Sequence, residues 1–162
     1  MITIDGGTGA ILHNGTSINS GNIIQTVQTV KTDTANTNSG TFADISGLSV
    51  SITPTSATSK ILYTGRLYIA SSGSEAVFRL RRGSSDIMTG TLDDTGDGSF
   101  CHGGGSRYGH HGWEFLDSPN TTNATTYGIQ WRVHSGTTYL NRTWDSGWFH
   151  GTSAITVMEI AA

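Results

Sequence analysis

The sequence predicts an all-β protein, an antiparallel, jelly-roll-like sandwich with a short N-terminal arm. Charged residues make up only 13% of the 162 residues, and Lys31 and Lys60 are the only lysines. Helix faces normally carry more charge than this, whereas the abundant Thr, Val and Ile suit a pleated sheet. Apolar residues also alternate with polar ones in short runs, which Gly, Asn, Ser and Asp separate.

Residues 1–22 are expected to form the arm and residues 23–162 the sandwich. The arm is rich in glycine and only weakly apolar, so few of its side chains can be buried. A frayed terminus is the alternative, since chain ends stay disordered unless contacts hold them. If the arm anchors the protein to a partner, the residues for this contact are Ile2, Ile4, Ile11, Leu12 and Ile18.

Three strands are expected in the first part of the sandwich. Residues 23–30 alternate and begin the fold, and residues 34–40 are interpreted as a polar loop. Residues 48–52 alternate again and end at Pro54, which cannot donate to a strand ladder. Residues 60–70 are apolar on both faces, so something besides the opposite sheet is expected to cover this strand.

The middle of the chain is predicted to hold a strand pair, a long loop and a further strand. Residues 76–81 and 87–88 are expected to pair across a turn at residues 83–86. Residues 91–112 are rich in Gly and Asp and are interpreted as a loop at one end of the domain. Residues 113–116 then form a strand that ends in a turn before residue 120.

The clearest alternation in the chain is at residues 127–134. Its apolar positions, which are expected to face the core, are Tyr127, Ile129, Trp131 and Val133. A turn at residues 135–136 predicts a hairpin with residues 137–142, and residues 153–160 form the last strand. About eight short strands and no helix of useful length indicate a jelly roll or a related sandwich.

No arrangement of residues indicates catalysis. The sequence has no nucleophile elbow, and nothing marks a partner carboxylate for Glu75, Glu114 or Glu159. The single cysteine, Cys101, cannot form a disulfide within the chain. We therefore expect a protein that assembles and binds, not an enzyme, with no catalytic residues and no cofactor.

Two motifs partly imitate metal sites. Residues 93–98 have the alternating oxygen ligands of a calcium loop but lack its bidentate glutamate. His102, His110 and His111 lie near Cys101, but adjacent ligands do not have the spacing of a zinc site. We predict no metal and interpret these histidines as loop residues, with packing near a threefold axis as one arrangement.

Aromatic residues concentrate in the C-terminal half of the chain. Trp131 belongs to an alternating strand and is expected in the core, whereas residues 143–150 are expected to form a loop. A binding or intersubunit role and a purely structural role both stay open for the two tryptophans of this loop. The candidate contacts with a partner or receptor are Tyr108, His110, His111, Trp144, Trp148 and Phe149.

The charge distribution excludes two classes of partner. A net charge of −3 and a pI near 6.0 provide no basic stripe for nucleic acid and no attraction to an anionic membrane. The N-terminus has no signal-peptide pattern, and no apolar run is long enough to span a bilayer. We expect a protein made in a cytoplasm that binds neither nucleic acid nor membrane.

Several long strings resemble a domain that is frequent in virion proteins of tailed phages from marine and freshwater sources. They are residues 23–33, 48–62, 115–127, 138–142 and 153–162, and the resemblance covers residues 23–162. It implies a virion structural protein that is trimeric and made in the host cytoplasm, and it supplies no catalytic residue. The sequence departs from the expected pattern at residues 107–112 and 144–150, where aromatic and His residues are more frequent.

The short arm favours one of two functions that the resemblance implies. The first is a homotrimeric capsid decoration protein, of the cement or head-fibre kind, whose arm binds the major capsid protein or another virion protein. The alternative is a short tail-fibre or receptor-binding tip protein whose loops at residues 98–112 and 144–150 contact host surface glycan. A depolymerase is less favoured than either. The two-sided apolar strand at residues 61–70 is a further reason to expect a trimer.

Overall fold

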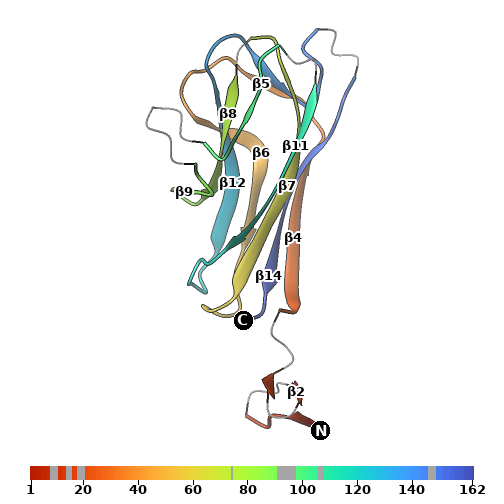
Figure 1. The fold of residues 1–162 in the computed structure, drawn as a ribbon, viewed down its shortest axis with the longest axis vertical. Helices are drawn as coiled ribbons and strands as arrows, with labels where there is room; N and C mark the ends of the chain where they lie inside the picture. Colours follow the sequence, from red (N-terminus) through yellow and green to blue (C-terminus); the bar gives the residue numbers. More distant parts are fainter. Residues whose placement is uncertain are drawn as a thin grey trace.

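The computed structural model describes residues 1–7, 11–13, 16–17, 21–73, 75–90, 98–105, 108–145 and 149–162. The regular structure of these residues consists of strands, arranged as two antiparallel sheets packed face to face and a separate small sheet (Figure 1). The predicted all-β sandwich is therefore confirmed. Within the described part of the chain, no helix is long and apolar enough to cross a membrane.

The first sheet of the sandwich has five strands in the order β10-β8-β12-β6, with β9 also paired to β8. β12 pairs with one edge of β8. The other edge of β8 pairs with β9 and β10, each along a different part of the strand. The strands are β6 (Ala43–Ile52), β8 (Ala76–Arg82), β9 (Ser85–Ile87), β10 (Phe100–His102) and β12 (Thr125–Val133).

The second sheet has six strands in the order β4-β14-β7-β13-β5, with β11 on the other edge of β7. The long β7 pairs first with β14 and, at its end, with β13. The strands are β4 (Ile23–Lys31), β5 (Ala35–Thr37), β7 (Lys60–Ser71), β11 (Gly109–Asp117), β13 (Thr138–Leu140) and β14 (Ser153–Ile160).

The core lies between the two sheets and follows the period of two. The four apolar residues predicted to face inward from β12 are all buried, Trp131 among them. Tyr63 of β7 contacts Tyr127 of β12 across the core, with ring centroids 5.2 Å apart. Alternate residues of a strand point to opposite faces of the sheet. The inward residues of one sheet therefore meet those of the other without help from a helix.

The predicted hairpin across residues 135–136 is wrong. β12 already pairs with β6 on one edge and β8 on the other, so no edge remains for β13. The chain instead crosses to the second sheet, where β13 pairs with β7 and β5. Gly73 and Gly136 lie in close backbone contact at this crossing, since a Cβ on Gly136 would lie 2.5 Å from the Cα of Gly73.

Two segments predicted as loops contain strands. Residues 34–40 include β5, and residues 91–112 include β10 and the beginning of β11. The strand predicted at residues 113–116 therefore starts four residues earlier, at Gly109. Gly and His obscure the alternation in this region, although His102 and Trp113 are both buried. The calcium-like motif falls almost wholly on residues 91–97, which lie outside the described residues.

The arm contains a small antiparallel sheet of β1 (Ile2–Ile4), β2 (Ile11–His13) and β3 (Thr16–Ser17). It lies beyond one end of the sandwich, near the C-terminus (Figure 1). The chain then enters β4 beside the end of β14. Gly21 N donates to Ala161 O, and Ala161 N donates to Asn22 O, both at 2.8 Å. These two bonds fix the place at which the arm leaves the sandwich.

Candidate functional site

The arm exposes large apolar side chains at one end of the molecule. Ile2 and Ile4 lie two residues apart in β1, on the same face of the strand, and are 69% and 74% exposed. β1 is an outer strand of the small sheet. Exposed isoleucines on such an edge favour contact with another protein, which can add both apolar cover and a neighbouring strand.

The other arm residues predicted for anchoring are only partly placed. Ile11 and Leu12 belong to β2, where they pair with Ile4 and Thr3. Their side chains, and the whole of Ile18, lie outside the described residues. Ile2 and Ile4 are thus the residues of the predicted anchor whose side chains the structure describes.

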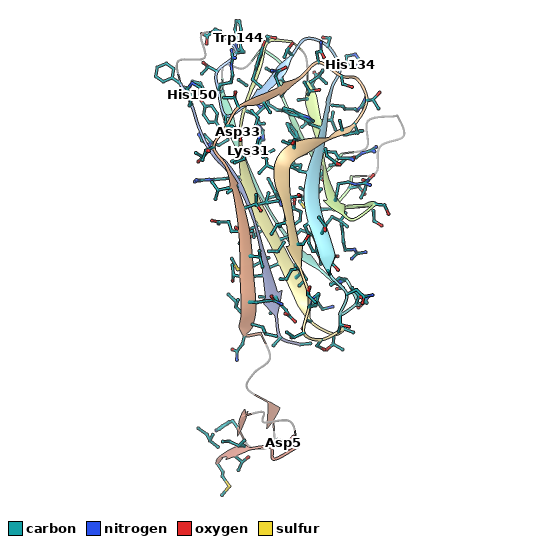
Figure 2. The ribbon with its side chains drawn as sticks, turned by 180° about the vertical axis from the view of Figure 1, so that it is seen from behind. Asp5, Lys31, Asp33, His134, Trp144 and His150 are labelled. Carbon is teal, nitrogen blue, oxygen red and sulfur yellow. The ribbon has the colours of Figure 1, made fainter. Side chains whose placement is uncertain are left out.

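A cleft of about 380 Å³ lies at the opposite end of the molecule, lined by Tyr68, Tyr108, Thr143, Phe149 and His150. Figure 2 shows Trp144 and His150 at this end, and Asp5 of the arm at the other. Tyr108 and Phe149 are 62% and 68% exposed, so their ring faces are open to solvent. None of the five lining residues is acidic, and none is Lys or Arg. The cleft therefore suits a neutral ligand.

Tyr68 forms the floor of this aromatic cleft. It lies on the outward side of β7, where its partner in β11 is His110, and the two rings meet edge to face at 5.0 Å. The ring of Tyr108 lies parallel to that of Tyr68, with centroids 6.2 Å apart. Burial raises the pKa of the Tyr68 hydroxyl, and the nearby Tyr108 adds to this effect. Tyr68 thus stays protonated and neutral at physiological pH.

Asn141 holds the loop that carries Phe149 and His150 against the floor. It is fully buried in a left-handed conformation, with φ of 60°, and Ser153 Oγ donates to its Oδ1 at 2.7 Å. Its backbone N donates to Tyr68 O at 2.8 Å, and its own O accepts from Gly151 N at 3.1 Å. Gly151 lies so close to the ring of Tyr68 that a Cβ there would collide with it.

The structure brings together some of the contact residues predicted from the sequence. Tyr108, His110 and Phe149 meet around Tyr68, and Trp144 lies in the same loop at this end of the molecule (Figure 2). Trp148 lies outside the described residues. Sequence reasoning missed Tyr68, which it treated only as part of a doubly apolar strand. The alternation of the strand could have identified it, since Tyr68 lies between the core residues Leu67 and Ile69 and therefore points to the opposite face of the sheet.

His111 lies apart from the aromatic cleft because it points between the two sheets. Its Nε2 lies 2.7 Å from Nδ1 of His102, and its ring stacks on that of Phe100 at 5.7 Å. His102 is only 4% exposed, and its Nε2 has no hydrogen-bond partner among the described residues. The prediction that His102, His110 and His111 are loop residues is wrong, because all three belong to strands.

A second hollow, of about 370 Å³, lies on the outer face of the five-stranded sheet. Its lining includes Cys101, Val77 and Arg132, which are successive neighbours across three strands. The described residues include no group of three or more His, Cys, Asp or Glu side chains that could hold a metal ion. The chain matches no family model and no curated protein.

Proposed function

We propose that this chain is a structural component of a virus particle, a decoration protein that its arm anchors to the major capsid protein or another virion protein. The observation that carries the proposal is the exposed pair Ile2 and Ile4, on a small sheet that projects beyond the sandwich. The virion assignment rests on the resemblance of residues 23–162 to a domain of phage virion proteins. The sandwich then forms the outward part of the subunit.

The energetics of the arm favour an oligomer. Burying an isoleucine side chain contributes about 1.5–3 kcal/mol, so Ile2 and Ile4 together supply several kcal/mol. Loss of translational and rotational freedom on binding opposes this gain and is of similar size. One arm is therefore a weak anchor. Several arms in one oligomer bind much more tightly, because the later contacts form within a single complex.

The test uses the full-length chain and particles assembled without it. The double variant Ile2→Asp with Ile4→Asp places two charges on the proposed contact, and we expect at least a tenfold loss of cosedimentation with the particles. Thr3→Asp is the matched control, since it adds a charge to the opposite face of the same strand. Undiminished binding of the double variant would exclude the arm as the anchor. An image of particles carrying a labelled chain then distinguishes head from tail.

The aromatic cleft favours a second candidate function, a receptor-binding tip protein that contacts host surface glycan. The open faces of Tyr108 and Phe149 can stack on the C–H face of a pyranose ring, and the neutral lining favours an uncharged sugar. The cleft also lies at the end remote from the arm (Figure 2). A bound protein would therefore present it outward.

An array of neutral and acidic glycans tests this second function. Tyr108→Ala and Phe149→Ala should each reduce binding to neutral glycans at least fivefold while circular dichroism shows that the sandwich stays folded. Met88→Ala is the control, because Met88 is an exposed apolar residue elsewhere on the molecule. Trp144→Ala shows whether the loop beside the cleft takes part. No binding to any glycan on the array by the unmodified chain would count against the tip function and leave the anchoring proposal standing.

A further inference from the structure

The outer faces of the two sheets differ in charge. The outer face of the five-stranded sheet carries Arg79 and Arg81, which both form ion pairs with Asp86. Asp44 on the same face accepts a hydrogen bond of 2.9 Å from Gln130. This is an ordinary solvated surface, rich in paired charges.

The outer face of the six-stranded sheet is mostly apolar or uncharged where β4, β14, β7 and β11 lie side by side (Figure 1). We call this surface the open face. Three rows of residues cross the open face, and each row has one residue from each of the four strands. They are Thr26, Met158, Leu62 and Leu116; then Gln28, Thr156, Thr64 and Glu114; then Val30, Ala154, Arg66 and Gly112. Only Arg66 and Glu114 of these twelve residues are charged.

In the part of the chain that the structure describes, several apolar residues of the open face are exposed, whereas Leu62 and Met158 are half-buried. Leu116 is 56% exposed, and Val30 and Ile24 are also exposed although they lie in well-formed strands. Further up β7 the chain provides its own cover, because Tyr68 is buried beneath Tyr108 and Gly151. Among the described residues, the cover expected for the second face of β7 is thus present at Tyr68, whereas Leu62 is only half-buried and its neighbour Leu116 is exposed.

The open face has the shape and charge to bind a copy of itself. A hollow of about 420 Å³, lined by residues of the second and third rows, lies next to the row that contains Leu62 and Leu116. The apolar row of one copy can lie over the hollow of a second copy, and the reverse. The single arginine and single glutamate of the three rows cancel, so two such surfaces do not repel each other.

The area of the open face is close to the lower limit for a specific interface. Four strands about 4.8 Å apart and about seven residues long, at about 3.3 Å per residue, cover a flat area of roughly 450 Å². Two copies would bury close to twice this area, and side-chain relief adds to it. Specific interfaces begin near about 1,000 Å² in total. The open face therefore lies at the lower end of the range for a stable contact.

We infer that a second copy of this chain covers the open face, and that this contact builds the homo-oligomer of the proposed function, on which the inference rests. The apolar row of Leu62, Met158 and Leu116 supplies most of the contact. Arg66 and Glu114 keep the surface neutral and exclude partners of strong net charge.

The test is the mass of the full-length chain in solution, measured by light scattering during size-exclusion chromatography. The unmodified protein should have a multiple of its monomer mass of 17.1 kDa at micromolar concentration. Leu116→Glu should reduce the mass to that of the monomer. Met88→Glu, the same change at an exposed apolar residue away from the open face, should leave the oligomer intact. A monomeric unmodified protein at about 100 μM, or a Leu116→Glu variant that stays oligomeric, would overturn the inference.

A charge-reversal series gives a second readout if circular dichroism shows that Leu116→Glu is unfolded. Arg66→Glu makes the three rows doubly negative and should dissociate the oligomer, whereas Arg66→Glu with Glu114→Arg restores neutrality and should recover it. An oligomer unaffected by Arg66→Glu would again overturn the inference. The arm variant with Ile2→Asp and Ile4→Asp should keep the oligomer, so failure of the anchor and failure of the open face give different results.

Discussion

Nδ1 of His102 lies 2.7 Å from Nε2 of His111, and this contact joins an outer strand of one sheet to an outer strand of the other. The rings of Phe100 and Phe78 stack at 4.9 Å beside the pair. Burial lowers the pKa of both imidazoles, and a neighbouring imidazole, His111 for His102 and His110 for His111, lowers each further. Both imidazoles are therefore neutral at physiological pH, and one of these two nitrogens donates a hydrogen bond to the other.

The first prediction is that the protein loses stability as the pH falls below about 6.5. An unfolded histidine titrates near 6.5, and the two folded imidazoles titrate lower, so in that interval the unfolded chain binds more protons. The free energy of unfolding then falls with pH until the folded pair is also protonated. Thermal unfolding between pH 8 and pH 5 should show a drop of at least a few °C.

His102→Leu removes the pair and should flatten this pH dependence, whereas His134→Gln, an exposed histidine outside the pair, should preserve it. An unfolding temperature that falls equally in all three proteins would show that other groups cause the loss.

The second prediction concerns Glu159, a fully buried carboxylate in β14. Burial by itself raises the pKa of Glu159, but hydrogen bonds from Gln25 and Thr55 outweigh it and hold the pKa at about 2. Gln25 Nε2 donates at 2.6 Å, and Thr55 N and Oγ1 each donate at 2.7 Å. This contribution to stability is present above the unfolded pKa of about 4.5 and is lost as the pH falls toward 2.

Glu159→Ala should cost about 2–3 kcal/mol at pH 7, because it removes three hydrogen bonds that Gln25 and Thr55 donate to a buried, charged acceptor. The difference from the unmodified protein should shrink below about pH 4.5, because Glu159 of the unfolded chain takes up a proton there while the folded carboxylate stays ionised. Urea unfolding at pH 7 and pH 3 measures both effects. A difference that stays constant between these pH values would contradict the low pKa of Glu159.

The strands with the strongest alternation could be predicted from sequence, and their connections could not. In β12 the apolar residues Tyr127, Ile129, Trp131 and Val133 alternate with polar ones because one face of the strand is buried. The turn that follows β12 looks the same whether the chain returns to its neighbour or crosses to the other sheet. The crossing is decided by β6 and β8, which occupy both edges of β12 and lie far away in the sequence.

The candidate site was likewise predicted only in part from the sequence. Composition identified Tyr108 and Phe149 because exposed aromatics in loops are unusual. Sequence reasoning placed His110 and His111 together, and the structure separates them, since adjacent residues of β11 point to opposite faces. Tyr68 was missed because its role depends on Gly151 and Tyr108, which close over it from distant parts of the chain.

The third prediction is that Gly65→Ala destabilises the sandwich. Gly65 lies on the inward side of β7, and the ring of Trp113 from β11 fills the space that a side chain would occupy. A Cβ at this position would also lie 2.8 Å from Ala154 O, which is backbone and cannot easily move. We expect a loss of about 2–3 kcal/mol by urea unfolding.

Gly112→Ala is the matched control, because Gly112 pairs across the same two strands and its nearest contact would be an ordinary 3.6 Å. It should change stability by less than about 1 kcal/mol. Equal effects of the two substitutions would show that the packing of Trp113 on Gly65 is not the cause.

The fourth prediction concerns Asp117, whose carboxylate links the two sheets near the end of β11. It accepts a hydrogen bond of 2.7 Å from the hydroxyl of Tyr127 in β12, and Arg82 Nη1 of β8 donates to its Oδ1 at 2.7 Å and its Oδ2 at 2.9 Å. The Asp117 side chain is almost fully buried, whereas Arg82 is partly open to solvent. Asp117→Ala removes the acceptor of the buried Tyr127 hydroxyl and the ion pair of Arg82, whose Nη1 keeps only a hydrogen bond of 3.3 Å to Ser118 O.

We expect Asp117→Ala to cost about 3–4 kcal/mol and Tyr127→Phe about 1–2 kcal/mol, because the second change keeps the ion pair with Arg82. Arg81→Ala is the control, since its ion pair with Asp86 lies on the solvated face and should contribute less than about 1 kcal/mol. In a double-mutant cycle, the effects of Asp117→Ala and Tyr127→Phe should add to more than that of the double variant, because both remove the same hydrogen bond. Strict additivity would mean that the Tyr127 hydroxyl and Asp117 stabilise the sandwich independently.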